Sequence, residues 1–311
     1  MTRWMRSSTG RLALVGLLVL LVVDAALVAL AFRPEAVGAE PVTPAPRSTP
    51  VTSTPTPSQT PETRPVPLRQ VVVALDDSRA WRAVLGTCEK GGAAIEVTGD
   101  GGRTWGTRAL PAKAKALGRV QPVSADRAFV IAADAGCKAG EYITEDGART
   151  WDGPRALQGG WSRTPGGASG TVVTPERPDA RPCGSGSLVD LARVSGTAAR
   201  ALCGDGSLTT SGDGGATWKT FAQADGALAL SVREEKGSAR AYVARVADGC
   251  EGVELARVTG KSATSVACIA TPDGLPEGRV SISVVDAAGW LAVGDTVWRS
   301  GGDLRTWTRT T

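Results

Sequence analysis

The residue types of this chain limit the chemistry that it can perform. None of its 311 residues is histidine, which excludes Ser-His-Asp and Cys-His nucleophilic sites and most metal-hydrolase sites. A hydrolase that uses two carboxylates needs a pair of acids at a defined separation, but the spacing of Asp and Glu singles out no such pair. We therefore expect no catalytic residue, no metal and no cofactor, and we favour a binding function.

The cysteines indicate an oxidising compartment. They are even in number, and none forms a CxxC pair that could hold a metal or act as a redox motif: Cys88, Cys137, Cys183, Cys203, Cys250 and Cys268. Disulfides are the better explanation for such a pattern, although six cysteines allow 15 pairings. Proximity in sequence favours Cys183–Cys203 and Cys250–Cys268, which leaves Cys88 for Cys137.

An octapeptide recurs four times in the second part of the chain. Two copies match Ser/Thr-x-Asp-x-Gly-x-Thr-Trp fully, a third has Ala148 at the glycine position, and the last has Gly302 where the aspartate belongs. The residues that carry the pattern are Asp100, Gly102, Thr104 and Trp105; Asp146, Thr150 and Trp151; Asp213, Gly215, Thr217 and Trp218; and Asp303 and Trp307.

The octapeptide is typical of a hairpin turn. A short β-rich segment precedes each copy, an aspartate in a turn accepts hydrogen bonds from backbone N–H groups, and glycine adopts positive φ without steric cost. The tryptophan then begins the next strand and covers the turn. We expect these residues to be structural.

On these octapeptides the domain resembles the Asp-box (BNR) β-propellers, which include sialidases, sortilin-type receptors and photosystem II stability factors. The resemblance implies an all-β propeller whose turns bear the octapeptides. It also implies that ligands bind on the opposite side, where most of the cysteine-bearing loops lie.

The spacing of the octapeptide tryptophans predicts the number of blades. They are 46, 67 and 89 residues apart, whereas a four-stranded blade needs about 40–50 residues. We predict five blades in residues 69–311, with six as the alternative. The excess in the middle interval falls at Gly159–Ser185, which is either a long loop or a degenerate blade.

A sialidase-like glycoside hydrolase is the enzymatic alternative that the resemblance suggests. The chain lacks the Arg-Ile-Pro element of that family, and its two tyrosines, Tyr142 and Tyr242, do not have the expected sequence setting. Acids on the expected ligand side are Glu89, Asp134, Glu141, Asp248 and Glu251. The candidate ligand contacts are Trp161 and Arg163, although Trp161 can equally pack beneath its own segment.

The N-terminal part predicts a membrane anchor and a stalk. Residues 12–32 are apolar except for Asp24 and are long enough as a helix to cross a bilayer of about 30 Å. Three arginines precede this run, so residues 1–11 should form a cytoplasmic tail. Residues 33–68 hold ten of the 19 prolines and many Thr and Ser residues, which predicts a disordered linker. A cleaved signal peptide, giving a secreted protein, is the alternative.

These features together predict a single-pass membrane protein with an extracytoplasmic propeller. We expect a monomeric binding or scaffold protein of the bacterial cell envelope, whose partner is a protein, a peptide or a glycan. An assembly factor for an envelope or membrane complex is a further alternative. A net charge of only +4 is too small to suggest nucleic-acid binding.

Overall fold

The computed structural model describes residues 64–157, 160–165, 170–286 and 288–310. Within these ranges no helix is long and apolar enough to cross a membrane. The predicted tail, the anchor at residues 12–32 and most of the linker lie outside them.

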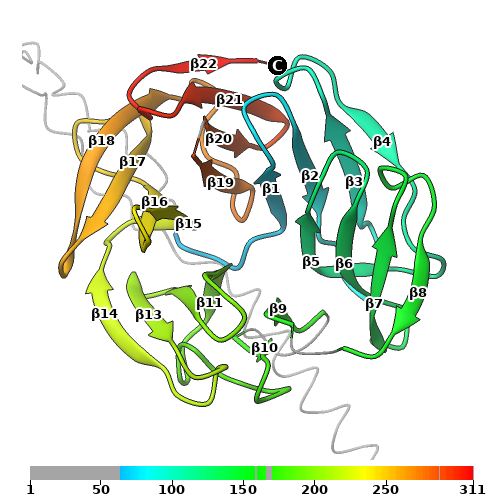
Figure 1. Ribbon diagram of the computed structural model, residues 1–311. Coiled ribbons are helices and arrows are strands. Elements are labelled where there is room, and N and C mark those ends of the chain that lie inside the picture. Colours follow the sequence, from blue (N-terminus) through cyan, green and yellow to red (C-terminus); the bar gives the residue numbers. More distant parts are fainter. Residues whose placement is uncertain (1–63, 158–159, 166–169, 287, 311) are drawn as a thin grey trace, which may run out of the picture. The chain divides into compact units, whose positions relative to one another are not determined.

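The described residues form five four-stranded antiparallel sheets, which are the blades of a β-propeller (Figure 1). The prediction of five complete blades is confirmed. Blade 1 contains β1 (Gln70–Ala74), β2 (Ala80–Val84), β3 (Ala94–Thr98) and β4 (Gly106–Arg108); blade 2 contains β5 (Ala116–Pro122), β6 (Ala128–Ala133), β7 (Ala139–Thr144) and β8 (Asp152–Arg155); blade 3 contains β11 (Leu188–Arg193), β12 (Ala199–Cys203), β13 (Ser207–Ser211) and β14 (Lys219–Gln223); blade 4 contains β15 (Ala227–Glu235), β16 (Ser238–Arg245), β17 (Gly252–Thr259) and β18 (Ser262–Ala270); and blade 5 contains β19 (Val280–Val285), β20 (Ala288–Val293), β21 (Thr296–Gly301) and β22 (Trp307–Arg309).

Between blades 2 and 3 lies a two-stranded sheet of β9 (Ser162–Arg163) and β10 (Val172–Val173). We call β9, β10 and the adjoining Trp161 the reduced unit. The ring of Trp161 packs edge-to-face on Trp218 of blade 3, just as Trp290 of blade 5 packs on Trp105 of blade 1. The reduced unit therefore gives blade 3 a contact that a complete blade gives elsewhere.

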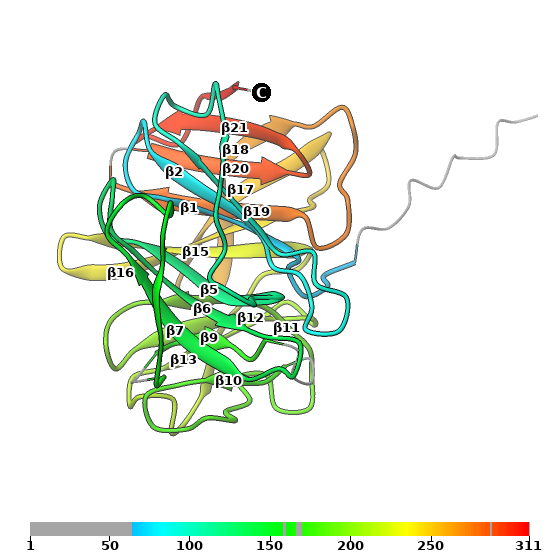
Figure 2. The ribbon, with the colours of Figure 1, turned by 90° about the vertical axis from the view of Figure 1, so that its right-hand side faces the viewer.

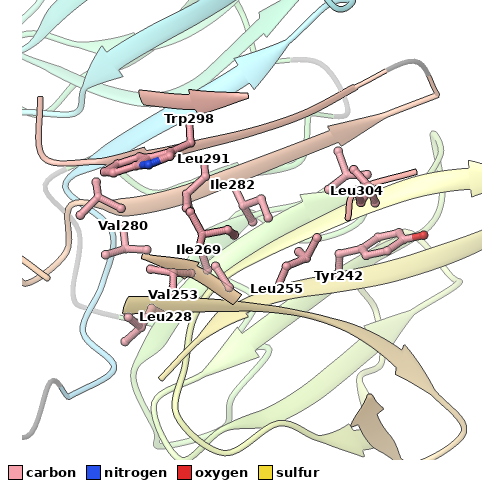
Figure 3. Packing of buried hydrophobic residues seen from close by; sticks show 14 of the residues in the cluster. Leu228, Tyr242, Val253, Leu255, Ile269, Val280, Ile282, Leu291, Trp298 and Leu304 are labelled. Atoms are coloured by element: carbon pink, nitrogen blue, oxygen red, sulfur yellow. The ribbon is translucent and has the colours of Figure 1, made fainter. Parts of the chain in front are cut away.

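Apolar clusters fill the other junctions between blades. One of them joins blades 4 and 5 through side chains such as Leu255, Ile269, Ile282 and Leu291 (Figure 3). Similar clusters join blades 3 and 4, blades 1 and 2, and blades 5 and 1. Burial of apolar area, at about 25 cal/mol per Å², is thus concentrated between blades.

Polar side chains of the inner strands also tie each blade to the next. The backbone N–H of Ala74 donates to the Ser283 hydroxyl at 3.0 Å, and that of Val284 donates to the Ser231 hydroxyl at 2.9 Å. Among the described residues no strand is exchanged between the first and last blades. The ring closes instead through contacts such as the buried Gln70 amide, which donates to the Gly294 carbonyl at 2.7 Å.

The first described residues lie across one end of the central channel. Leu68 is buried in the cluster of blades 4 and 5, and its backbone N–H donates to the Val189 carbonyl of blade 3 at 3.2 Å. The folded domain therefore begins before residue 69. In Figure 2 this segment enters from the side opposite the β15–β16 hairpin. It lies on the side of the β2–β3 loop, since Pro67 and Leu68 line one cavity with Leu85 and Thr87.

The three disulfides pair as predicted: Cys88–Cys137, Cys183–Cys203 and Cys250–Cys268. The first joins the loop after β2 in blade 1 to the loop after β6 in blade 2. The second joins the segment that follows the reduced unit to blade 3, and the third lies within blade 4. This arrangement suits an extracytoplasmic domain, because disulfides persist in oxidising compartments.

The first three octapeptides form the same turn. In the first, the Thr104 backbone N–H and hydroxyl donate to the two carboxylate oxygens of Asp100, at 3.0 and 2.6 Å, and Gly102 N–H donates to the Thr98 hydroxyl at 3.0 Å. The second and third repeat these bonds around Asp146 and Asp213. Ala148 takes the glycine position at a φ of 65°.

The fourth octapeptide makes a different turn, because Gly302 has replaced the aspartate. The Asp303 carboxylate receives the Arg305 N–H at 3.2 Å, and Trp307 donates to the Leu304 carbonyl at 2.9 Å. The buried Ser300 hydroxyl, which corresponds to Thr98, finds no hydrogen-bond partner among the described residues. One missing carboxylate therefore removes the whole hydrogen-bond pattern.

The aspartates of the three intact turns should make stability depend on acid pH. Bonds from the Thr104, Thr150 and Thr217 hydroxyls, and then from backbone N–H groups, lower the pKa of Asp100, Asp146 and Asp213 from 3.8 to about 2. A carboxylate whose pKa is lowered on folding stabilises above its unfolded pKa, and this contribution disappears as pH falls toward the folded value. The free energy of unfolding should therefore fall between pH 4 and pH 2.

The matching measurement is denaturant unfolding at several pH values between 5 and 2. A variant with all three aspartates changed to Asn should show a shallower fall over this window. The control changes three exposed aspartates outside the turns, Asp179, Asp248 and Asp286, to Asn. Equal slopes for the triple-turn variant and the parent would contradict the assignment.

Candidate functional site

The incomplete junction between blades 2 and 3 contains a groove of about 380 Å³. It extends from Arg119 and Gln121 on β5, over β6 and Glu141 of β7, to Arg193 of β11. Arg119, Gln121 and Arg193 also line a cavity of about 190 Å³ in the central channel. The groove and the channel therefore share a wall of two arginines and one glutamine.

The groove opens on the side of the octapeptide turns. It reaches Val123, which lies in the β5–β6 turn. That turn contacts the second octapeptide, since Gly147 N–H donates to the Asp126 carbonyl at 2.7 Å. The groove thus lies at the opposite end of the strands from the cysteine-bearing loops.

Arg119 is a largely buried cation that forms no ion pair within 4.0 Å among the described residues. It lies on the inner strand of blade 2, and its Nη2 donates to the Gln121 carboxamide oxygen at 2.8 Å. Burial, and then the positive charge of Arg193, lower the pKa of Arg119 to about 10, and the Glu141 carboxylate acts in the opposite direction. The guanidinium therefore stays protonated at neutral pH.

Arg193 is exposed at the edge of the groove. Its Nε donates to the Ser195 carbonyl at 3.0 Å, and the two terminal nitrogens of the guanidinium have no acceptor among the described residues. Such a planar group can bind a carboxylate through two parallel hydrogen bonds. The arrangement is chemically suited to hold an anion.

A second polar cluster surrounds Glu235 at the end of β15. The Arg233 guanidinium and the Tyr242 hydroxyl both donate to its Oε1, and Arg257 donates to Oε2 at 3.2 Å. The Tyr242 bond lowers the pKa of Glu235, whereas burial and this same bond raise the pKa of Tyr242. Figure 3 shows the Tyr242 hydroxyl directed away from the apolar cluster that holds its ring.

This cluster places a tyrosine beside a glutamate, as a sialidase nucleophile would require. A tyrosine that attacks must lose its proton, but here its pKa moves in the other direction. Tyr242 is also only 2% exposed. The cluster therefore acts as an internal network in blade 4, and Arg233 extends it to the Val285 carbonyl of blade 5.

The two predicted ligand contacts lie in the reduced unit. Trp161 is only 2% exposed, and its indole N–H donates to the carbonyls of Ser195 and Gly196 at 3.2 and 3.1 Å. The ring is thus almost fully covered and packs against blade 3. Arg163 lines the channel cavity but forms an ion pair with Asp190 at 2.8 Å.

The acids named from the sequence do not come together. Of these five residues, only Glu141 lines the groove. Asp134 instead accepts the backbone N–H groups of Gly136 and Lys138 at 2.9 and 3.0 Å. Sequence reasoning missed Arg119, Gln121 and Arg193. The available signal was a pair of polar residues at alternate positions of an otherwise apolar inner strand, Ala116–Pro122.

No protein-family model matches the chain, and no curated protein matches it either. Solved structures do match. YCF48 from Cyanidioschyzon merolae is 18% identical, with 80% of this chain and 87% of that chain covered and a TM-score of 0.37. The α-L-arabinofuranosidase PaAbf62A from Podospora anserina is 10% identical, with coverage of 79% and 86% and a TM-score of 0.40. The Aleuria aurantia lectin is 10% identical, with coverage of 79% and 80% and a TM-score of 0.35. These likenesses assign no ligand or activity to this chain.

Proposed function

We propose that this protein is an extracytoplasmic binding propeller of the Asp-box type, tethered to the cell membrane by residues 12–32. The observation that carries the binding function is the groove between blades 2 and 3. It combines a sizeable hollow with cationic and amide donors, whereas Tyr242 is buried and its hydroxyl is bonded to Glu235. A hydrolase is therefore the weaker alternative.

The proposal of a tether is supported by the apolar run of 21 residues and by the arginines before it. The Pro/Thr-rich linker that follows would hold the propeller away from the membrane surface. A binding module needs no more than this arrangement. The partner would be another component of the cell envelope.

Photo-crosslinking in cells tests both parts of the proposal. A photoreactive amino acid replaces Val123, which is 50% exposed at the groove, and in a control replaces Val246, which is 38% exposed on blade 4. We expect a crosslinked partner from position 123 alone, in the membrane fraction, with the propeller accessible to external protease. The absence of a specific adduct at position 123 would contradict the binding function. Full-length protein in the culture medium would contradict the tether.

A further inference from the structure

Many arginines of the propeller with largely buried side chains are paired with an acid: Arg82 with Glu96, Arg163 with Asp190, Arg233 with Glu235 and Arg245 with Glu254. The half-buried Arg200 instead donates to the Ala239 carbonyl at 2.9 Å and packs over the Phe221 ring. Arg119 and Arg193 form no ion pair with any described acid within 4.0 Å. The internal segments outside the described ranges, 158–159, 166–169 and 287, contain no Asp or Glu.

An unpaired buried charge is costly to fold. Arg119 has one hydrogen bond, to Gln121, and Arg193 has one, to the Ser195 carbonyl. Each guanidinium carries five N–H donors, so most of these donors have no acceptor among the described residues. Both side chains line the groove and the channel cavity, where a bound group can reach them.

The number of charges selects the kind of anion. The groove contains two arginines and one acid, Glu141, which gives a net charge of +1 in the lining. A monoanionic carboxylate balances this charge, whereas a phosphate monoester carries about −1.5 to −2 at pH 7. The planar guanidinium also matches the two oxygens of a carboxylate.

An apolar wall lies beside the arginines. Val123, Phe129 and Ile131 line the same groove, and Val123 is 50% exposed. The guanidinium of Arg127 lies over the Phe129 ring, 5.5 Å from its centroid, and holds this side chain in place. Such a wall suits an aliphatic or aromatic side chain better than the hydroxyl-rich surface of a sugar.

We propose that the groove between blades 2 and 3 binds the C-terminal carboxylate of a peptide whose last side chain is apolar. Arg119 and Arg193 hold the carboxylate, and Val123 and Phe129 contact the side chain. The two arginines lie where the groove meets the channel, so the groove is open to solvent at its other end. The rest of the peptide chain leaves through that end. This proposal rests on the binding function proposed above and names its ligand.

The probe is a fluorescent peptide that ends in Gly-Leu with a free carboxylate, titrated into the detergent-solubilised full-length protein. The first control is the same peptide with a C-terminal amide. The second is free glucuronate, added as a competitor. We expect the free acid to bind about tenfold or more tightly than the amide, because hydrogen bonds to charged groups contribute about 1.5–3 kcal/mol. Glucuronate should compete weakly, since it lacks an apolar group.

The variant Arg193→Gln should abolish the preference for the acid over the amide. It changes an exposed side chain with one backbone contact. The matched control is Arg103→Gln, an exposed arginine of the first octapeptide turn, which should bind both peptides as the parent does. Equal binding of acid and amide, unchanged binding by Arg193→Gln, or binding of glucuronate alone would overturn the proposal. A crosslinked partner at position 123 would still stand in that case, so the two proposals fail separately.

Discussion

Replacing Asp190 by Ala is expected to destabilise the propeller by about 3–5 kcal/mol, the cost of leaving one buried charge without its partner. The Oδ1 of Asp190 receives Arg163 and the Leu191 N–H, at 2.8 and 2.7 Å. Its Oδ2 receives the Leu230 N–H of blade 4, also at 2.8 Å. This one carboxylate thus links the reduced unit, blade 3 and blade 4.

The expected change is large enough to measure by calorimetry under oxidising conditions. For a domain of this size about 1 kcal/mol corresponds to 2–4 °C, so the midpoint should fall by roughly 6–20 °C. The control is Asp179→Ala, an exposed acid of the segment after β10, which should change the midpoint little. The double variant Arg163→Met/Asp190→Leu removes both charges, so its midpoint should fall by less than that of Asp190→Ala alone. An unchanged midpoint in Asp190→Ala would show that the reduced unit is not held by this ion pair.

Changing both Cys88 and Cys137 to Ser is expected to cost about 4 kcal/mol, because the disulfide closes a loop of 49 residues and restricts the unfolded chain. The same change at Cys250 and Cys268, which are 18 residues apart, should cost about 3 kcal/mol. Denaturant unfolding of the oxidised proteins measures both losses through the shift of the midpoint.

The two disulfides also differ in place, which gives a second measurement. Cys88–Cys137 joins two blades, whereas Cys250–Cys268 lies within one blade. Near the first, Leu117 N–H of blade 2 donates to the Leu85 carbonyl of blade 1 at 2.7 Å. Hydrogen exchange at Leu117 should accelerate in the Cys88/Cys137 variant and stay slow in the Cys250/Cys268 variant. Equal exchange in both would mean that the junction of blades 1 and 2 closes without the disulfide.

Features that depend on neighbouring residues were predictable from the sequence alone. The octapeptide turn closes over five residues, from Asp100 to Thr104, so its pattern of Asp, Gly and Thr is visible without the fold. Its first interval, of 46 residues, fits one blade, and its last, of 89 residues, fits two, which led to the count of five blades. Two of the disulfides join cysteines at most 20 residues apart, and the third followed by elimination.

Features that depend on which blades meet were decided by the tertiary structure. Arg119 and Arg193 are far apart in sequence, and they face one groove because the reduced unit does not fill the junction between blades 2 and 3. The hydrogen bonds of Tyr242 and the burial of Trp161 likewise depend on contacts between strands or blades. A sequence pattern reports the pairing of adjacent strands, because that pairing is local. It does not report the packing between blades. At the junction of blades 2 and 3 the reduced unit is incomplete, and Arg119 and Arg193 therefore line a candidate site.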